Sequence, residues 1–145
     1  MGMDNSDDDE LVRLREKRLR EMMGEMMGER MYSPGRVSRM VKEVTDMNIT
    51  DLIQAHRYLV VDCWAEWCGP CMTIAPVIEQ LAGEFGETVA FGKCDADMNT
   101  EVMRAYQISV IPTLLFFADG LLTGRLTGAY PKDSIRASIL RTFGI

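Results

Sequence analysis

Hydrophobic and polar residues follow two different patterns along this chain, and the change comes near residue 35. Residues 8–31 are rich in good helix formers, and at 100° per residue their apolar side chains fall in one broad stripe. The stripe consists of Leu11, Val12, Leu19, Met22, Met23, Met26 and Met27. We therefore expect a helix here, either a docking element for a partner protein or a frayed or self-packed extension. Ser33-Pro34-Gly35 ends the pattern, because proline cannot continue a helix.

From residue 37 onwards, strand-like and helix-like segments alternate. The pattern predicts strands over 37–44, 58–64, 89–94, 113–117 and 121–126, and helices over 48–55, 70–85, 101–106 and 133–142. Helices between strands imply parallel strands, whereas Ala118-Asp119-Gly120 marks an antiparallel hairpin. We predict an α/β fold with a central mixed five-stranded sheet flanked by helices, plus the N-terminal helix. The expected domains are an extension over 1–36, helical or partly disordered, and a compact domain over 37–145.

Composition and charge narrow the class of protein. The 145 residues suffice for about one domain, and the net charge of −6 argues against binding to nucleic acid through phosphate contacts. No apolar run approaches the roughly 20 residues that a membrane helix needs. Asp7, Asp8, Asp9 and Glu10 make the N-terminus unlike a secretory signal. We therefore expect a cytoplasmic monomer, in a compartment where most thiols stay reduced.

The four cysteines are Cys63, Cys68, Cys71 and Cys94. Cys68 and Cys71 form a Cys-x-x-Cys pair, which is typical either of redox chemistry or of half a zinc site. Zinc needs two further ligands, and His56 is the only histidine, so we predict no metal site. The 95–99 segment, Asp-Ala-Asp-Met-Asn, imitates the start of a calcium loop but lacks its later glycine and glutamate, so we expect an ordinary polar loop there.

The surroundings of the Cys-x-x-Cys pair favour redox chemistry. Cys68 follows a predicted strand and begins a predicted helix, where free N–H groups and the helix dipole favour a thiolate. A thiolate is the nucleophile of disulfide exchange. Pro70 suits a first helical turn, and Cys71 lies on the same helix face as Cys68. We expect Cys68 to be the exposed attacking thiol and Cys71 the more buried resolving thiol.

Residues 37–145 resemble the thioredoxin family, whose active-site motif is Trp67-Cys68-Gly69-Pro70-Cys71. The resemblance implies that Asp62 is a buried carboxylate beneath the second cysteine and that Lys93 is its buried partner. It also implies a cis proline at Pro112 that faces the dithiol. Met72 departs from the family pattern, because many members carry a lysine or arginine there. The residues that the resemblance assigns to the substrate surface are Trp67, Gly69, Pro70, Ile111, Pro112 and Gly128.

Elementary electrostatics agrees with a catalytic role for Asp62. Burial should raise the pKa of this carboxyl, and the positive charge of Lys93 should oppose the rise. A carboxylate that titrates near neutral pH can take a proton from Cys71. A purely structural ion pair between Asp62 and Lys93 is the alternative.

The expected activity is reduction of protein disulfides, with electrons supplied by an upstream thioredoxin reductase and with no cofactor on this chain. Two alternatives remain open. One is a disulfide oxidase or isomerase on the same fold, although the Gly69 and Pro70 between the cysteines argue against it. The other is a partner-binding subunit with a vestigial dithiol.

The remaining cysteines lie at a revealing spacing. Asp62 and Lys93 are 31 residues apart, and so are Cys63 and Cys94. If the first pair meets across neighbouring parallel strands, the second pair must meet on the opposite face, since strand side chains alternate. We expect two reduced, buried thiols that act as apolar filler, with a second redox pair as the alternative.

Overall fold

The structure is a computed structural model that describes residues 12–18 and 40–145. The chain divides into two units, Met1–Arg36 and Val37–Ile145. Residues 12–18 are helical, and Val12 and Leu14 are exposed on them. The rest of the helix expected over 8–31 lies outside the described residues, as do residues 37–39 of the first expected strand. The expected character of the two units, a helical or partly disordered extension over 1–36 and a compact domain over 37–145, stays a prediction.

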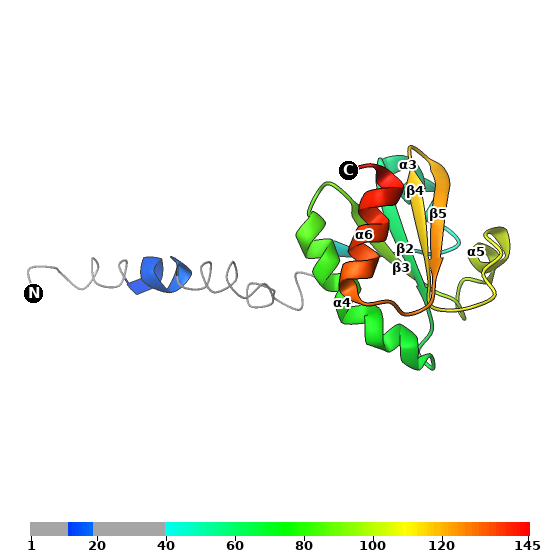
Figure 1. Cartoon of the computed structure of the whole chain (residues 1–145), viewed down its shortest axis with the longest axis horizontal. Coiled ribbons are helices and arrows are strands. Elements are labelled where there is room, and N and C mark those ends of the chain that lie inside the picture. The colour runs from blue at the N-terminus through cyan, green and yellow to red at the C-terminus, as the bar shows by residue number, and fades with distance from the viewer. Residues whose placement is uncertain (1–11, 19–39) are drawn as a thin grey trace, which may run out of the picture. The chain divides into compact units, whose positions relative to one another are not determined.

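Within residues 40–145, strands and helices follow one another in the predicted order (Figure 1). The elements are β1 (Val41–Glu43), α3 (Ile49–Ala55), β2 (Tyr58–Trp64), α4 (Gly69–Phe85), β3 (Ala90–Asp95), α5 (Thr100–Ala105), β4 (Thr113–Ala118), β5 (Leu121–Thr127) and α6 (Lys132–Phe143). Most bounds differ from the sequence prediction by one residue, because caps and fraying rather than periodicity fix where an element ends.

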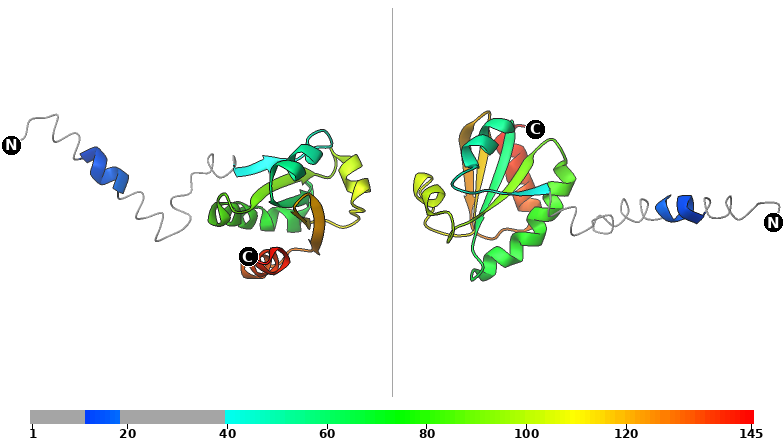
Figure 2. Two further views of the ribbon diagram at one scale, coloured as in Figure 1. Left: turned by 90° about the horizontal axis from the view of Figure 1, so that it is seen from above. Right: turned by 180° about the vertical axis from the view of Figure 1, so that it is seen from behind.

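The five strands form one mixed sheet in the order β1-β3-β2-β4-β5. β3 pairs in parallel with both β1 and β2, whereas β4 pairs antiparallel with β2 and β5. Helices α4 and α6 cover one face of the sheet and α3 covers the other (Figure 2). The predicted class, an α/β fold with a central mixed sheet flanked by helices, is therefore confirmed.

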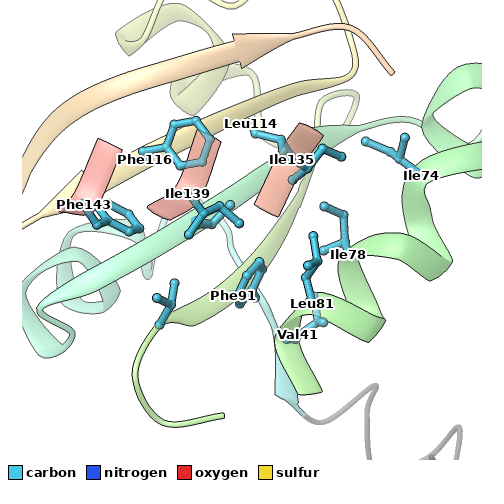
Figure 3. Packing of buried hydrophobic residues seen from close by; sticks show 13 residues of the cluster. Val41, Ile74, Ile78, Leu81, Phe91, Leu114, Phe116, Ile135, Ile139 and Phe143 are labelled. Carbon is cyan, nitrogen blue, oxygen red and sulfur yellow. The ribbon is translucent and has the colours of Figure 1, made fainter. Parts of the chain in front are cut away.

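The sheet separates two hydrophobic clusters. On the α4/α6 face, side chains of the helices meet those of the strands, as Figure 3 shows for Ile78, Phe91 and Ile139. The cluster on the opposite face joins α3 and α5 to the sheet and includes both remaining cysteines, Cys63 and Cys94. Alternation along β2 produces this division, since successive strand residues point to opposite faces.

The hairpin between β4 and β5 forms where the sequence predicts it. Asp119 and Gly120 have φ angles of 52° and 84°, and two-residue hairpins of this hand need positive φ at both central positions. The pairing shifts register between Phe116 and Phe117.

Among the helices of residues 12–18 and 40–145, none is both long and apolar enough to cross a membrane.

Candidate active site

The Cys-x-x-Cys pair lies where a strand passes into a helix. β2 ends at Trp64 and α4 begins at Gly69, with Cys68 as its N-cap. The backbone N–H of Cys71 donates to Sγ of Cys68 at 3.2 Å. A disulfide joins the two cysteines, whose Cα atoms are 5.3 Å apart. The first turn of α4 thus holds two sulfurs within bonding reach of each other, as the spacing predicts.

The two cysteines are less accessible than the sequence suggests. Cys68 exposes 5% of its surface and Cys71 exposes 1%, so the expectation that Cys68 is exposed is wrong. The expected order, with Cys71 the more buried, is correct. Trp64 and Ile111 pack around the pair, and Sγ of Cys68 lies 3.9 Å from the carbonyl oxygen of Ile111. This packing depends on a loop more than 40 residues away, which helix periodicity alone does not reveal.

The loop before β4 borders the cysteines. The peptide bond between Ile111 and Pro112 is cis. The carbonyl oxygen of Pro112 accepts a hydrogen bond from the N–H of Gly128 at 2.8 Å, and Gly128 has a φ of +112° that favours glycine. The structure therefore brings Ile111, Pro112 and Gly128 together beside Cys68.

Trp67 projects from the turn before α4. Its side chain exposes 72% of its surface, and its indole Nε1–H donates to Oδ2 of Asp97 at 2.9 Å. Sequence reasoning missed this partner. Asp97 lies 30 residues away in the loop after β3, and nothing in the local pattern marks it. The indole thus has a fixed polar anchor and an open apolar surface.

Asp62 is buried on β2, opposite Lys93 of β3 in the parallel register. It exposes 4% of its surface, and its Oδ1 has no hydrogen-bond partner among residues 12–18 and 40–145. Burial raises the pKa of Asp62 to about 7, and the charge of Lys93 partly opposes the rise. Both directions agree with the sequence prediction. An unpartnered carboxyl that titrates near neutral pH is equipped to accept a proton.

Lys93 differs from the expectation, because its side chain is exposed rather than buried. Its Nζ lies 5.5 Å from the centre of the Trp64 ring, and no ion pair with Asp62 forms within the described part of the chain. The flexible stem of a lysine allows the ammonium to reach solvent from a strand position that faces inward. Lys93 therefore acts on Asp62 only through its electrostatic field.

Cys63 and Cys94 are register partners on β2 and β3, as their spacing predicts. Both are free, both are 0% exposed, and both belong to the cluster on the face away from Asp62. Burial, and to a smaller extent nearby negative charge, raises the pKa of Cys63 above its usual range and that of Cys94 to about 12. Neither sulfur forms a reactive thiolate at neutral pH in this environment.

Thiol labelling of the native, reduced protein should therefore distinguish the cysteines. Iodoacetamide should modify Cys68 quickly, whereas Cys63 and Cys94 should react only after unfolding, because exclusion from solvent and a raised pKa both suppress the thiolate. Peptide mapping by mass spectrometry measures each site, and the urea-unfolded chain is the control for intrinsic reactivity. Rapid labelling of Cys63 or Cys94 in the native protein would contradict their assignment as apolar filler.

Polar side chains fasten the loop that imitates a calcium site. Asn99 accepts from the N–H of Asp46 at 3.0 Å and donates to the carbonyl oxygen of Asp95 at 3.0 Å. Oδ1 of Asp95 accepts from the N–H of Asp97. The Asp46–Asn99 hydrogen bond thus ties this loop to the turn after β1, and the other two hydrogen bonds lie within the loop itself. Among the described residues, no group of three or more His, Cys, Asp or Glu side chains could hold a metal ion.

Comparison with known proteins gives a consistent result. The family model described as Thioredoxin matches residues 40–141. Thioredoxin of Mycobacterium tuberculosis is 40% identical over 94 residues, which cover 64% of this chain and 81% of that protein. The bifunctional thioredoxin reductase/thioredoxin of Mycobacterium leprae is 38% identical over 94 residues, 64% of this chain and 20% of that protein. The solved structure of a mutant thioredoxin from Halobacterium salinarum aligns with a TM-score of 0.66 and 30% identity, over 72% of this chain and 91% of that one.

Proposed function

The chain belongs to the thioredoxin family, and we propose that Cys68, Cys71 and Asp62 carry out its chemistry. The protein is a thiol–disulfide oxidoreductase that reduces protein disulfides. The observation that carries the proposal is the disulfide-bonded pair in the first turn of α4, with the more exposed cysteine at the N-cap.

Cys68 makes the first attack. In the reduced protein, the N–H of Cys71 and the positive end of the α4 dipole stabilise its thiolate. The thiolate attacks one sulfur of the target disulfide, forms a mixed disulfide and expels the other target sulfur as a thiolate. Ile111, Pro112 and Gly128, together with Trp67, Gly69 and Pro70, form the surface on which the target segment lies.

Cys71 then resolves the mixed disulfide. Its thiol passes a proton to the carboxylate of Asp62 and attacks Sγ of Cys68, which releases the second target sulfur. The products are the Cys68–Cys71 disulfide and two target thiolates, so two electrons have moved from this protein to the target. One target thiolate takes the proton held by Asp62, and the other takes a solvent proton that replaces the one Cys68 lost on ionising. Lys93 tunes the proton affinity of Asp62 through its field.

The oxidised pair must be reduced before the next cycle. We propose an upstream thioredoxin reductase as the electron donor. The similar Mycobacterium leprae protein supports this partner, because its name describes a bifunctional thioredoxin reductase/thioredoxin. We further propose that the protein works as a cytoplasmic monomer in electron transport between this reductase and its targets. The net charge of −6 supports a monomer, because like charges oppose self-association. The free thiols of Cys63 and Cys94 suit a reducing compartment.

Turbidimetric reduction of insulin tests the function directly. The full-length protein with dithiothreitol should precipitate the insulin B chain much faster than dithiothreitol alone. A catalytically silent protein with an intact fold would instead favour the partner-binding alternative. The reduction potential then separates a reductase from an oxidase, since oxidising relatives of this fold have higher potentials.

Deletion of residues 1–35 should leave insulin reduction nearly unchanged, because all proposed catalytic residues lie after residue 60. The measurement compares initial rates of the truncated and full-length proteins, with circular dichroism as the control for folding. A truncated protein that fails to fold would show that the methionine stripe belongs to the core of the domain.

A further inference from the structure

The three most exposed large apolar side chains of the described residues lie outside the helices and strands. Met47 exposes 90% of its surface, Met98 76% and Trp67 72%. Met47 lies in the turn between β1 and α3, and Met98 in the loop between β3 and α5. Exposed methionines serve at surfaces that adapt to varied partners, because the side chain is flexible and polarisable. Neither methionine takes part in the chemistry described above.

Hydrogen bonds hold these three residues on one connected framework. Trp67 donates to Asp97, the residue before Met98. Asn99, the residue after Met98, accepts from the N–H of Asp46, the residue before Met47. Oδ1 of Asp46 in turn accepts from the N–H of Val102 in α5 at 2.9 Å. The two methionines are therefore presented by loops that are tied to each other and to Trp67.

The same framework is rich in negatively charged side chains. An acidic residue directly precedes each apolar one, namely Asp46, Glu66 and Asp97. Segments 43–51 and 95–101 together contain six carboxylates and no lysine or arginine. In the part of the chain that the structure describes, none of these side chains forms an ion pair. Such a surface complements a segment that joins apolar and basic side chains.

We propose that Met47 and Met98, continuous with Trp67, form a specificity surface that selects disulfide-bearing targets whose reactive cysteine is flanked by apolar and basic residues. The occupant is a segment of the target protein, which lies on Trp67 at the dithiol and extends over the two loops. This inference rests on the proposed function and specifies its substrate class.

Disulfide-linked peptide homodimers test the surface. Each of three peptides contains a single cysteine, and the peptides differ only in the two residues that flank it. These residues are leucine and lysine in the first peptide, serine and lysine in the second, and leucine and glutamate in the third. The reduced full-length protein is mixed with each, the reaction is quenched with acid, and the peptide thiols are quantified by chromatography. Each peptide disulfide that is reduced yields two thiols and oxidises one Cys68–Cys71 dithiol. The time course of peptide thiol formation therefore gives the second-order rate constant.

The wild-type protein should reduce the leucine–lysine peptide about fivefold faster than either other peptide, a ratio that corresponds to about 1 kcal/mol of contact with the surface. The double variant Met47→Ser/Met98→Ser should lose the preference for leucine over serine. Glu66→Gln/Glu101→Gln should lose the preference for lysine over glutamate, and added salt should weaken that preference in the wild type.

Two matched controls lie at the far end of the sheet. Leu121 is 70% exposed in the β4–β5 hairpin, and Glu87 is exposed beyond the end of α4. Leu121→Ser and Glu87→Gln should keep both preferences. Equal wild-type rates for the three peptides would overturn the specificity surface while leaving the reductase function intact, whereas failure to reduce any of them would overturn both. A change of sedimentation coefficient in Met47→Ser/Met98→Ser without a change in peptide preference would assign the surface to a second copy of the chain and overturn the proposal.

Discussion

Cys71→Ser should accumulate a covalent adduct with a disulfide-bearing target, whereas Cys68→Ser should accumulate none. Both variants should reduce insulin no faster than the background reaction, since a serine hydroxyl is not ionised at neutral pH and cannot replace a thiolate. The asymmetry follows from position. Cys68 is the N-cap of α4 and the more exposed of the two cysteines, and Cys71 lies inside the first turn. Without Cys71, the mixed disulfide on Cys68 has no internal resolving thiol.

Intact-protein mass spectrometry measures this adduct, and dithiothreitol should release it. The matched control is Cys63→Ala/Cys94→Ala, which removes the two cysteines on the other face of the sheet and should keep turnover. Equal yields of adduct from Cys68→Ser and Cys71→Ser would reverse the assignment of the two thiols. An adduct on Cys63 or Cys94 would show that these residues are reached in the native fold.

Much of the fold follows from patterns that are local in the sequence. Apolar periodicity and the Asp119-Gly120 turn predict the order of elements in residues 40–145. The family resemblance pairs Asp62 with Lys93, and the shared spacing of 31 residues then predicts that Cys63 pairs with Cys94. A register is a property of the backbone, so it survives errors of one residue in the ends of the strands.

What the sequence does not predict depends on side chains that meet across long stretches of chain. Lys93 faces the predicted side of the sheet, but its length allows it to leave the interior past Trp64. Cys68 is covered because Ile111 reaches it from another loop. The Trp67–Asp97 and Asp46–Asn99 hydrogen bonds join residues 30 and 53 positions apart. Composition identifies such polar loop residues without identifying their partners.

Asp62→Asn should stabilise the oxidised protein above neutral pH and leave it unchanged in acid. In the folded chain burial raises the pKa of Asp62 from 3.8 to about 7, whereas in the unfolded chain it stays near its ordinary value. The folded wild type thus binds an extra proton between about pH 4 and pH 7, so its free energy of unfolding falls as pH rises through that window. The shift corresponds to at most about 4 kcal/mol at pH 8.

Urea unfolding of the wild type and of Asp62→Asn at pH 4 and pH 8 measures this difference. The two proteins should be nearly equal at pH 4, where the wild-type carboxyl is neutral in the folded state and close to its ordinary pKa in the unfolded state, and the variant should be the more stable at pH 8. A gain of the same size at both pH values would point to packing rather than to the buried charge. Lys93→Gln supplies an electrostatic comparison, because loss of the opposing cation should raise the pKa of Asp62 further. In this variant the free energy of unfolding should therefore continue to fall up to a higher pH than in the wild type.

The same substitution should slow reduction while it stabilises the fold. An amide keeps the shape of the carboxyl but cannot accept the proton of Cys71, and a positioned general base contributes about 10²-fold or more to such a step. Resolution of the mixed disulfide should therefore become rate-limiting in Asp62→Asn. Acid quenching of a single turnover should then trap more of the mixed disulfide between Cys68 and the target than in the wild type.

The pH dependence of the rate tests the same role. The wild-type rate should rise as pH passes through about 7, where Asp62 becomes ionised, and the variant should lack this rise. Equal rates for the two proteins across pH 6–8 would leave Asp62 as a structural carboxyl only. A slower and more stable variant would instead show that the domain retains a destabilising buried acid for its chemistry.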